Sequence, residues 1–178
     1  MSDYYWLTET QLELIKPYFP RSHGKPRVDD RRVISGIIHV IRNGLRWRDA
    51  PQVYGPHKTL YNRFVRCSRM GVFDRIFSGL VANSGEPDTV MIGDKGYDSD
   101  EFRDALNARK IKACIPPRSN RTVPRHYSKT LYKQRHKIEN MFSKLKDWRR
   151  IATRYDRCPH TFMSAICIAA TVIFWIHQ

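Results

Sequence analysis

An aspartate stands directly after a strand-like apolar run in the stretch VMIGDKGYDSDEF, residues 90–102. A carboxylate at the end of a buried strand is a common feature of metal-dependent phosphate chemistry, because hard divalent cations prefer oxygen ligands. Asp94 is therefore a candidate metal ligand. A catalytic metal needs several ligands, so other residues must join Asp94 if it acts in this way.

A second constellation consists of Tyr132, Arg135, Glu139 and Lys146, in a segment that we expect to form one long helix over about 129–149. At the rotation of an α-helix, these four side chains lie within about 60° of one another. The neighbouring apolar stripe is expected to pack inward, and it consists of Leu131, Ile138, Phe142 and Leu145. Glu139 would then be a metal-binding carboxylate at the edge of the core, with basic neighbours for a DNA backbone. The alternative is an ordinary surface Arg–Glu pair, which the spacing alone favours.

Charge is the dominant feature of the composition, since 32 Lys+Arg against 17 Asp+Glu give a net charge of +15 in 178 residues. A field of that strength favours a polyanionic partner, with nucleic acid well ahead of an anionic membrane surface. The apolar run 165–176 is shorter than the roughly 20 residues needed to cross a bilayer, so we expect a buried terminal helix. The four cysteines form no zinc-type pair and are expected to be reduced thiols in a cytosolic protein.

Short helices are predicted for the first half of the chain. Thr8 and Gln11 have the spacing of a capping box at the start of the first helix. Asp29 or Asp30 can cap the second helix, and Gly44 is placed to end it.

A third helix is expected to begin near His57 or Lys58, and its apolar face would bury Leu60, Phe64 and Cys67. Its outward face would carry Lys58, Tyr61, Asn62, Arg63, Arg66 and Arg69. Such a helix suits a helix-turn-helix arrangement, in which one helix enters the major groove of DNA. The predicted DNA-binding residues are Lys58, Asn62, Arg63 and Arg66, with the cations on phosphates and Asn62 or an arginine on base edges. The alternative is a basic face that is merely solvated, and Trp47 before this helix is expected to be a core or hinge aromatic.

The pattern changes near Asn83. A strand is predicted at 89–92, a helix capped by Asp98 or Ser99 follows, and a second strand is predicted at 111–115. The expected fold class is therefore α+β and mostly α, with a helix-turn-helix-like DNA-binding domain over 1–82 and a second domain over 83–178.

Four long motifs of the chain resemble the insertion sequence five group of bacterial transposases, which have a DDE catalytic site. They are GLRWRDAPQVYGPHKTLYNRF, GDKGYDSDEFRDAL, IPPRSNRTVPRHY and LYKQRHKIENMFSKLKDWRRIATRYD. The spacing of Tyr132, Arg135, Glu139 and Lys146 is similar to the Y-R-E-K signature around the last acid of that group.

This resemblance implies that the second domain is a ribonuclease H-like α/β domain in which three carboxylates hold two divalent cations, Mg²⁺ or Mn²⁺. Such a site cleaves a DNA strand and transfers it. By motif, Asp94 corresponds to the second acid and Glu139 to the third, so both are implied catalytic and metal-binding residues. Arg135, Lys146 and Tyr132 correspond to the signature residues that contact DNA.

The first acid of the family pattern is missing. EPDTVMI resembles the approach to the first acid and GDKGYDSD the approach to the second, and the two are joined at about Ile92-Gly93. An in-frame internal deletion would produce this seam, and it would leave an incomplete ribonuclease H-like domain. Glu86 and Asp88 lie at the wrong end of the strand to substitute, while Asp98 and Asp100 are expected to cap the next helix or to be solvated.

Three hypotheses remain from the sequence. The chain could be a DNA-binding transposase-family protein for DNA transposition whose catalysis is lost. It could be a non-enzymatic repressor that occupies element ends or forms mixed oligomers with intact transposase, or it could be a pseudogene product. For the first two hypotheses the expected partner is double-stranded DNA at terminal inverted repeats and target sites, without a membrane, in the bacterial cytoplasm and nucleoid.

Overall fold

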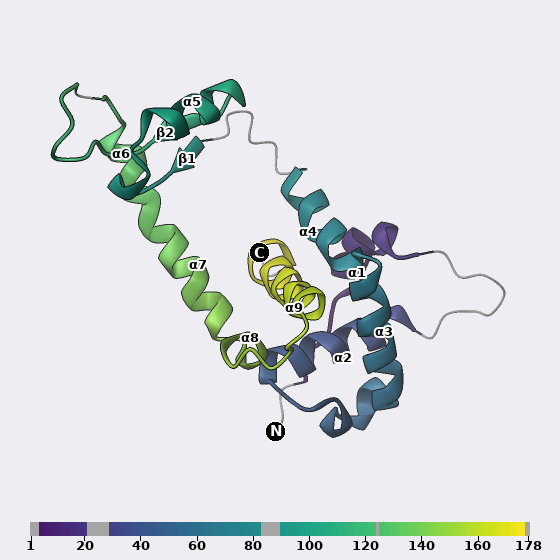
Figure 1. Cartoon of the computed structure of the whole chain (residues 1–178). Helices are drawn as coiled ribbons and strands as arrows, with labels where there is room; N and C mark the ends of the chain where they lie inside the picture. Colours follow the sequence, from purple (N-terminus) through teal and green to yellow (C-terminus); the bar gives the residue numbers. More distant parts are fainter. Residues whose placement is uncertain (1–3, 21–28, 83–89, 124, 177–178) are drawn as a thin grey trace. The chain divides into compact units, whose positions relative to one another are not determined.

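A computed structural model describes residues 4–20, 29–82, 90–123 and 125–176 of the chain. These residues belong to two compact units, one formed by 1–83 together with 143–178 and the other by 84–142 (Figure 1). Each unit is described by itself. The candidate acids Glu86 and Asp88 lie outside the described residues.

The first unit is helical (Figure 1). Its helices are α1 (Glu9–Ile15), α2 (Asp30–Asn43), α3 (His57–Arg69), α4 (Val72–Ala82), α8 (Arg149–Ala152) and α9 (Pro159–Thr171), and a π-helical turn (Val172–Ile176) follows α9. The predicted caps are confirmed: Thr8 and Gln11 form the capping box of α1, Asp29 caps α2, and Gly44 ends α2 with a φ of 66°. That positive φ explains the glycine, since residues with a Cβ rarely adopt it.

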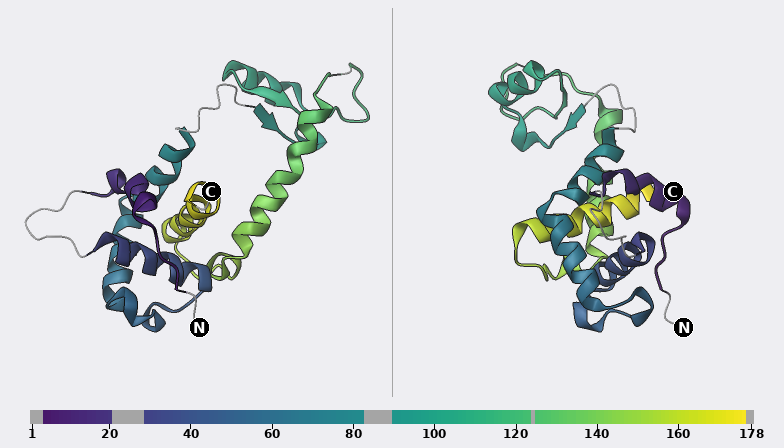
Figure 2. Two further views of the ribbon diagram at one scale, coloured as in Figure 1. Left: turned by 180° about the vertical axis from the view of Figure 1, so that it is seen from behind. Right: turned by 90° about the vertical axis from the view of Figure 1, so that its right-hand side faces the viewer.

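The core of the first unit forms around α9, which packs against α2, α3, α4 and α8 (Figure 2). Ile37, Ile41, Leu60 and Phe64 are at most 1% exposed. Pro159–Ile176 is the one helical stretch, among the described residues, that is long and apolar enough to cross a membrane by length and composition. Half of that stretch is buried within the protein, in line with the predicted buried terminal helix.

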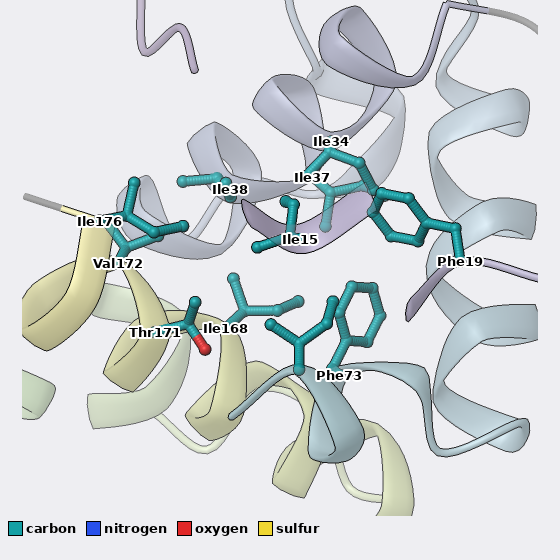
Figure 3. A pocket seen from close by; sticks show the side chains of 11 residues that line it. Ile15, Phe19, Ile34, Ile37, Ile38, Phe73, Ile168, Thr171, Val172 and Ile176 are labelled. Carbon is teal, nitrogen blue, oxygen red and sulfur yellow. The ribbon is translucent and has the colours of Figure 1, made fainter. Parts of the chain in front are cut away.

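A small apolar cavity of about 20 Å³ lies inside this core and is lined by side chains from α1, α2, α4 and α9 (Figure 3). Its lining includes Ile34 and Ile37 from α2, Phe73 from α4, and Ile168 and Thr171 from α9. Thr171 is 4% exposed, and its hydroxyl has no hydrogen-bond partner among the described residues. The cavity is a packing defect in an aliphatic core that contains one unsatisfied polar atom.

The second unit contains a two-stranded parallel sheet. Strand β1 (Val90–Ile92) pairs with β2 (Lys112–Cys114) in the register Val90↔Lys112, and α5 (Asp100–Ala108) connects the strands. Ser99 caps α5 by accepting a hydrogen bond from the Phe102 N–H. The mostly helical α+β class is therefore confirmed, with a sheet of only two strands in the described residues.

The predicted continuous helix over 129–149 is wrong. The chain forms α6 (Lys129–Tyr132), a 3-10 turn (Lys133–Arg135) and α7 (His136–Lys146), and α7 ends before Trp148. The boundary between the two units falls within α7. The 3-10 turn changes the rotation per residue, so Tyr132 and Glu139 do not share one regular α-helix.

Two of the four residues of the apolar stripe on this segment are exposed, although the stripe was expected to be buried. Ile138 is 41% exposed and Phe142 is 53% exposed, whereas Leu145 is 8% exposed. A helix face of this kind needs a sheet or another helix to cover it. The two-stranded sheet of the second unit does not cover Ile138 and Phe142.

The division into a DNA-binding domain at 1–82 and a ribonuclease H-like domain at 83–178 stays a prediction. The compact units divide the chain differently, because residues 143–178 pack with the N-terminal helices.

Candidate DNA-contact surface and acidic residues

The exposed face of α3 carries three of the four residues of this helix that were predicted to contact DNA. Lys58, Asn62 and Arg66 are exposed, and no carboxylate among the described residues forms an ion pair with Lys58 or Arg66. A shallow hollow of about 550 Å³ follows this face and is lined by Tyr61, Asn62, Val65, Arg66, Arg69 and Met70. The opposite face buries Leu60 and Phe64, so the core fixes the direction in which the basic face points.

Arg63 differs from the other predicted α3 residues. Its guanidinium forms an ion pair with Asp30, and its side chain is 19% exposed. It also lies 5.7 Å from the centre of the Phe19 ring. The prediction that Arg63 points outward is wrong, because α3 turns this position toward the start of α2.

Asp94 lies where the sequence predicted it, directly after β1 and the buried Gly93. It is exposed and stands at the N-cap of a 3-10 turn, Lys95–Tyr97, where its Oδ1 accepts a hydrogen bond from the Gly96 N–H at 2.7 Å. The side chain therefore organises its own turn.

Glu139 lies in the first turn of α7 and is 66% exposed. Its Oε1 accepts a hydrogen bond from Arg135 at 3.1 Å, which is the ordinary i,i+4 pair that the spacing allowed. Tyr132 packs edge-on against Tyr127 with ring centres 5.6 Å apart. Lys146 is exposed at the end of α7, in the part of the helix that belongs to the first unit.

Asp98 is the acid whose role the sequence did not indicate. It is buried, and it accepts hydrogen bonds from Arg103 at 2.8 Å, from Arg121 at 2.9 Å and from the Arg118 N–H at 2.8 Å. Burial raises the pKa of Asp98, but these hydrogen bonds outweigh it and lower the pKa to about 2. The predicted capping or solvated role for Asp98 is wrong, because Ser99 caps α5 and Asp98 binds the segment after β2.

Asp100 behaves differently from Asp98, because it is 60% exposed and forms ion pairs with Arg121 and Arg125. Hydrogen bonding to Arg125 is the main cause that lowers the pKa of Asp100.

The donor set does not fit a two-metal site. Among the residues that the structure describes, no three His, Cys, Asp or Glu side chains gather closely enough to hold a metal ion. Asp98 is not available as a metal ligand, since its Oδ1 accepts from the Arg103 and Arg121 side chains and its Oδ2 accepts from the Arg118 N–H. The predicted ligands Asp94 and Glu139 are two carboxylates, which is fewer than a two-metal clamp requires.

The sequence also gave no indication that Arg150 is buried among aromatic side chains. This side chain is 1% exposed, and its guanidinium lies 4.8 Å from the Trp47 ring centre and 4.2 Å from the Tyr155 ring centre. Trp47 also packs on Phe64, with ring centres 5.1 Å apart, so it is partly buried as predicted for a core or hinge aromatic. No local sequence signal indicates that Arg150, a residue type that is usually exposed, belongs to the core.

Comparison with known proteins identifies the class of both halves of the chain. A family model described as "Putative transposase of IS4/5 family" matches residues 7–77, and a model described as "Transposase DDE domain" matches residues 91–175. The DDE domain implies a ribonuclease H-like fold and dependence on a divalent metal by family.

Three relatives cover much of the chain. An uncharacterized 16.2 kDa protein of insertion element IS402 from Burkholderia cepacia is 31% identical over 70% of this chain and 86% of the relative. The uncharacterized protein y4sN from Sinorhizobium fredii is 28% identical over 64% of this chain and 90% of the relative. A "Putative transposase for insertion sequence element IS6501" from Brucella ovis is 39% identical over 47% of this chain and 65% of the relative. No solved structure matches the chain.

This chain therefore belongs to the transposase family of bacterial insertion sequences.

Proposed function

We propose that this chain is a DNA-binding member of the transposase family that contacts duplex DNA through α3 and has lost strand cleavage and transfer. The observation that carries the proposal is the exposed face of α3, where Asn62, Arg66 and Arg69 line one side of a helix whose other side is fixed in the core. The net charge of +15 supports a polyanionic partner for that face.

The chemistry of the α3 side chains suits duplex DNA. Lysine and arginine neutralise phosphates and position the protein, whereas Asn62 offers both a donor and an acceptor to a base edge. The connection between α2 and α3 spans residues 44–56, which is longer than the turn of about three to four residues in a helix-turn-helix motif. We therefore propose a helix-turn-helix-like presentation of α3 with an extended connection, directed at the terminal inverted repeats of the element.

Loss of catalysis is supported by the acids. The match to the DDE domain begins at residue 91, beside the seam at Ile92-Gly93 where the approaches to the first and second acids are joined. Asp94 caps its own turn and Glu139 pairs with Arg135. In this proposal both residues derive from metal ligands of the family, and Tyr132, Arg135 and Lys146 retain at most phosphate contacts.

A second candidate function is repression of transposition through mixed oligomers with an intact transposase. The exposed Ile138 and Phe142 favour it, because an uncovered apolar helix face can be buried against a partner. Either function places the chain with DNA in the bacterial cytoplasm.

An electrophoretic shift assay tests DNA recognition by α3. The probes are duplexes with and without the terminal inverted repeat from the DNA that flanks the gene, at fixed ionic strength. Arg66→Ala should weaken binding to both and reduce the slope of log K against log salt by about 0.9, because one phosphate contact is lost. Asn62→Ala should mainly reduce the preference for the repeat.

The matched control is Lys16→Ala, which removes an exposed cation that pairs with Glu13 on the short turn after α1. It should leave the affinity and the salt slope unchanged. Equal effects of Arg66→Ala and Lys16→Ala would contradict recognition by α3, because they would indicate only a general effect of net charge.

A further inference from the structure

A groove of about 430 Å³ lies next to the N-terminal end of α3 and is separate from the hollow along its exposed face, apart from the shared Tyr61. It is lined by the loop Arg46–Arg48, by His57, Lys58 and Tyr61 of α3, and by Tyr155. All of these residues belong to the first unit, although Tyr155 comes from the C-terminal part of the chain. Two distant parts of the sequence therefore form one concave surface.

The buried side chain of Arg150 fixes the position of Tyr155. Its ring stacks on the buried guanidinium of Arg150, at 4.2 Å, while 46% of the residue remains exposed. Arg150 is held in turn by two hydrogen bonds to Asp156 and by one to the Leu45 carbonyl at 2.7 Å. An exposed aromatic ring on a rigid, hydrogen-bonded support is preorganised for contact, because little conformational freedom is lost when a ligand binds.

The groove has a positive charge. Arg46 and Arg48 share one carboxylate, Asp49, at 2.6 and 3.8 Å, and Lys58 has no ion-pair partner among the described residues. Pro56 stands at the N-cap of α3 and provides no side-chain cap, so the positive end of a 13-residue helix adds to this field. Cations beside exposed tyrosine rings match the phosphates and sugars of a nucleic-acid backbone.

We propose that this groove holds the sugar-phosphate backbone of duplex DNA that flanks the stretch contacted by α3, with Lys58 and Tyr155 as contact residues. This inference rests on the proposed function, which it extends to a second part of the surface. DNA contact then requires residues from both matched family regions, since Lys58 lies in 7–77 and Tyr155 in 91–175. Arg150 is a positioning residue in this arrangement and touches no DNA.

Hydroxyl-radical footprinting of the full-length chain tests the proposal. The probe is an end-labelled duplex that carries the terminal inverted repeat and its natural flank. Tyr155→Ala and Lys58→Ala should each lose protection at one edge of the footprint, keep the protection at its centre, and lower the affinity roughly fivefold. Shortening the duplex at that edge should abolish the difference between these variants and the wild type.

Two controls separate the possible outcomes. Tyr4→Ala removes a tyrosine of similar exposure, 42%, which packs against His39 and Tyr54 and does not line the groove, and it should leave the footprint unchanged. Arg66→Ala should weaken the whole footprint. If Arg66→Ala weakens binding while Lys58→Ala and Tyr155→Ala keep full edge protection, the groove proposal is overturned and the proposed function stands. If Arg66→Ala has no effect, the proposed function fails instead.

Folding does not obscure this test. Tyr155→Ala removes the ring over Arg150, so its thermal unfolding is recorded in parallel. Lys58 is exposed and makes no ion pair within the described residues, so Lys58→Ala decides the result if Tyr155→Ala does not fold.

Discussion

Arg150 and Asp156 form an ion pair with two hydrogen bonds, from Nε to Oδ2 at 2.7 Å and from Nη2 to Oδ1 at 3.0 Å. The side chain of Arg150 is 1% exposed and that of Asp156 is 11% exposed. Through Nη1, Arg150 also donates to the carbonyl of Leu45, which is 105 residues away in the sequence. This side chain therefore joins the C-terminal segment to the connection before α3.

Arg150→Met is expected to destabilise the first unit by about 3 kcal/mol, because it leaves Asp156 without its cation in a poorly solvated position. Arg150→Lys should also destabilise it, since an ammonium group cannot make the paired, planar contacts of a guanidinium. Urea unfolding measures both effects. Lys16→Ala at the exposed Glu13 pair is the control and should not shift the midpoint. If Arg150→Met leaves the unfolding free energy unchanged, the ion pair does not stabilise the first unit.

The hydrogen bonds of Asp98 should make the stability of the second unit sensitive to acid. Its pKa is lowered from 3.8 to about 2 in the folded protein, so the charged form is favoured by folding. The resulting stability is present above about pH 4 and is lost as the pH falls from about 4 toward 2. Asp98→Asn should lower stability at neutral pH and flatten this part of the profile.

Circular dichroism during acid titration of the wild type and Asp98→Asn measures this effect. Asp104→Asn, at an exposed acid of α5, is the matched control. Identical acid profiles for Asp98→Asn and the wild type would rule out the proposed role of the Asp98 hydrogen bonds.

Substitutions at two apolar positions of α7, three residues apart, should lower the unfolding free energy by unequal amounts. Phe142→Ser should change the unfolding free energy by less than about 0.5 kcal/mol, because the ring is already 53% exposed. Leu145→Ala should cost about 2–3 kcal/mol, because Leu145 is buried. Urea unfolding compares the two variants, and a large cost at Phe142 would mean that the ring is covered in solution.

A substitution at Thr171 is expected to stabilise the first unit. Thr171→Val replaces the unsatisfied hydroxyl beside the cavity in Figure 3 by a methyl group of similar shape, and it should raise the unfolding free energy by about 1 kcal/mol. Thr171→Ser is the control, because it keeps the hydroxyl and enlarges the cavity, so it should destabilise. Thermal unfolding distinguishes these outcomes, and a destabilised Thr171→Val variant would imply that the hydroxyl has a partner in solution.

Local features of this protein could be predicted from the sequence. The caps at Thr8, Asp29 and Gly44 and the buried face of α3 depend on residues within one or two turns, so spacing alone defines them. The position of Asp94 after a strand was predictable for the same reason.

Features that depend on distant partners could not be predicted. Arg121, which binds Asp98, is 23 residues away in the sequence, and Arg63 meets Asp30 across 33 residues. The burial of Ile138 and Phe142 was predicted incorrectly, because the helical period indicates an apolar face but does not say whether a sheet is present to cover it. The described residues of the second unit contain only the two strands β1 and β2, and no local pattern in the sequence shows that so small a sheet leaves these side chains exposed.

In the proposed function, this chain binds the ends of its element without cutting them. The most direct test is to incubate the full-length chain with a supercoiled plasmid that carries both terminal inverted repeats, with Mg²⁺ or Mn²⁺, and to measure nicked, linear and transferred products while footprinting the ends. Asp94→Ala and Glu139→Ala serve as controls. We predict protected ends and no products above background, whereas products that either substitution abolishes would contradict the proposed loss of strand cleavage and transfer.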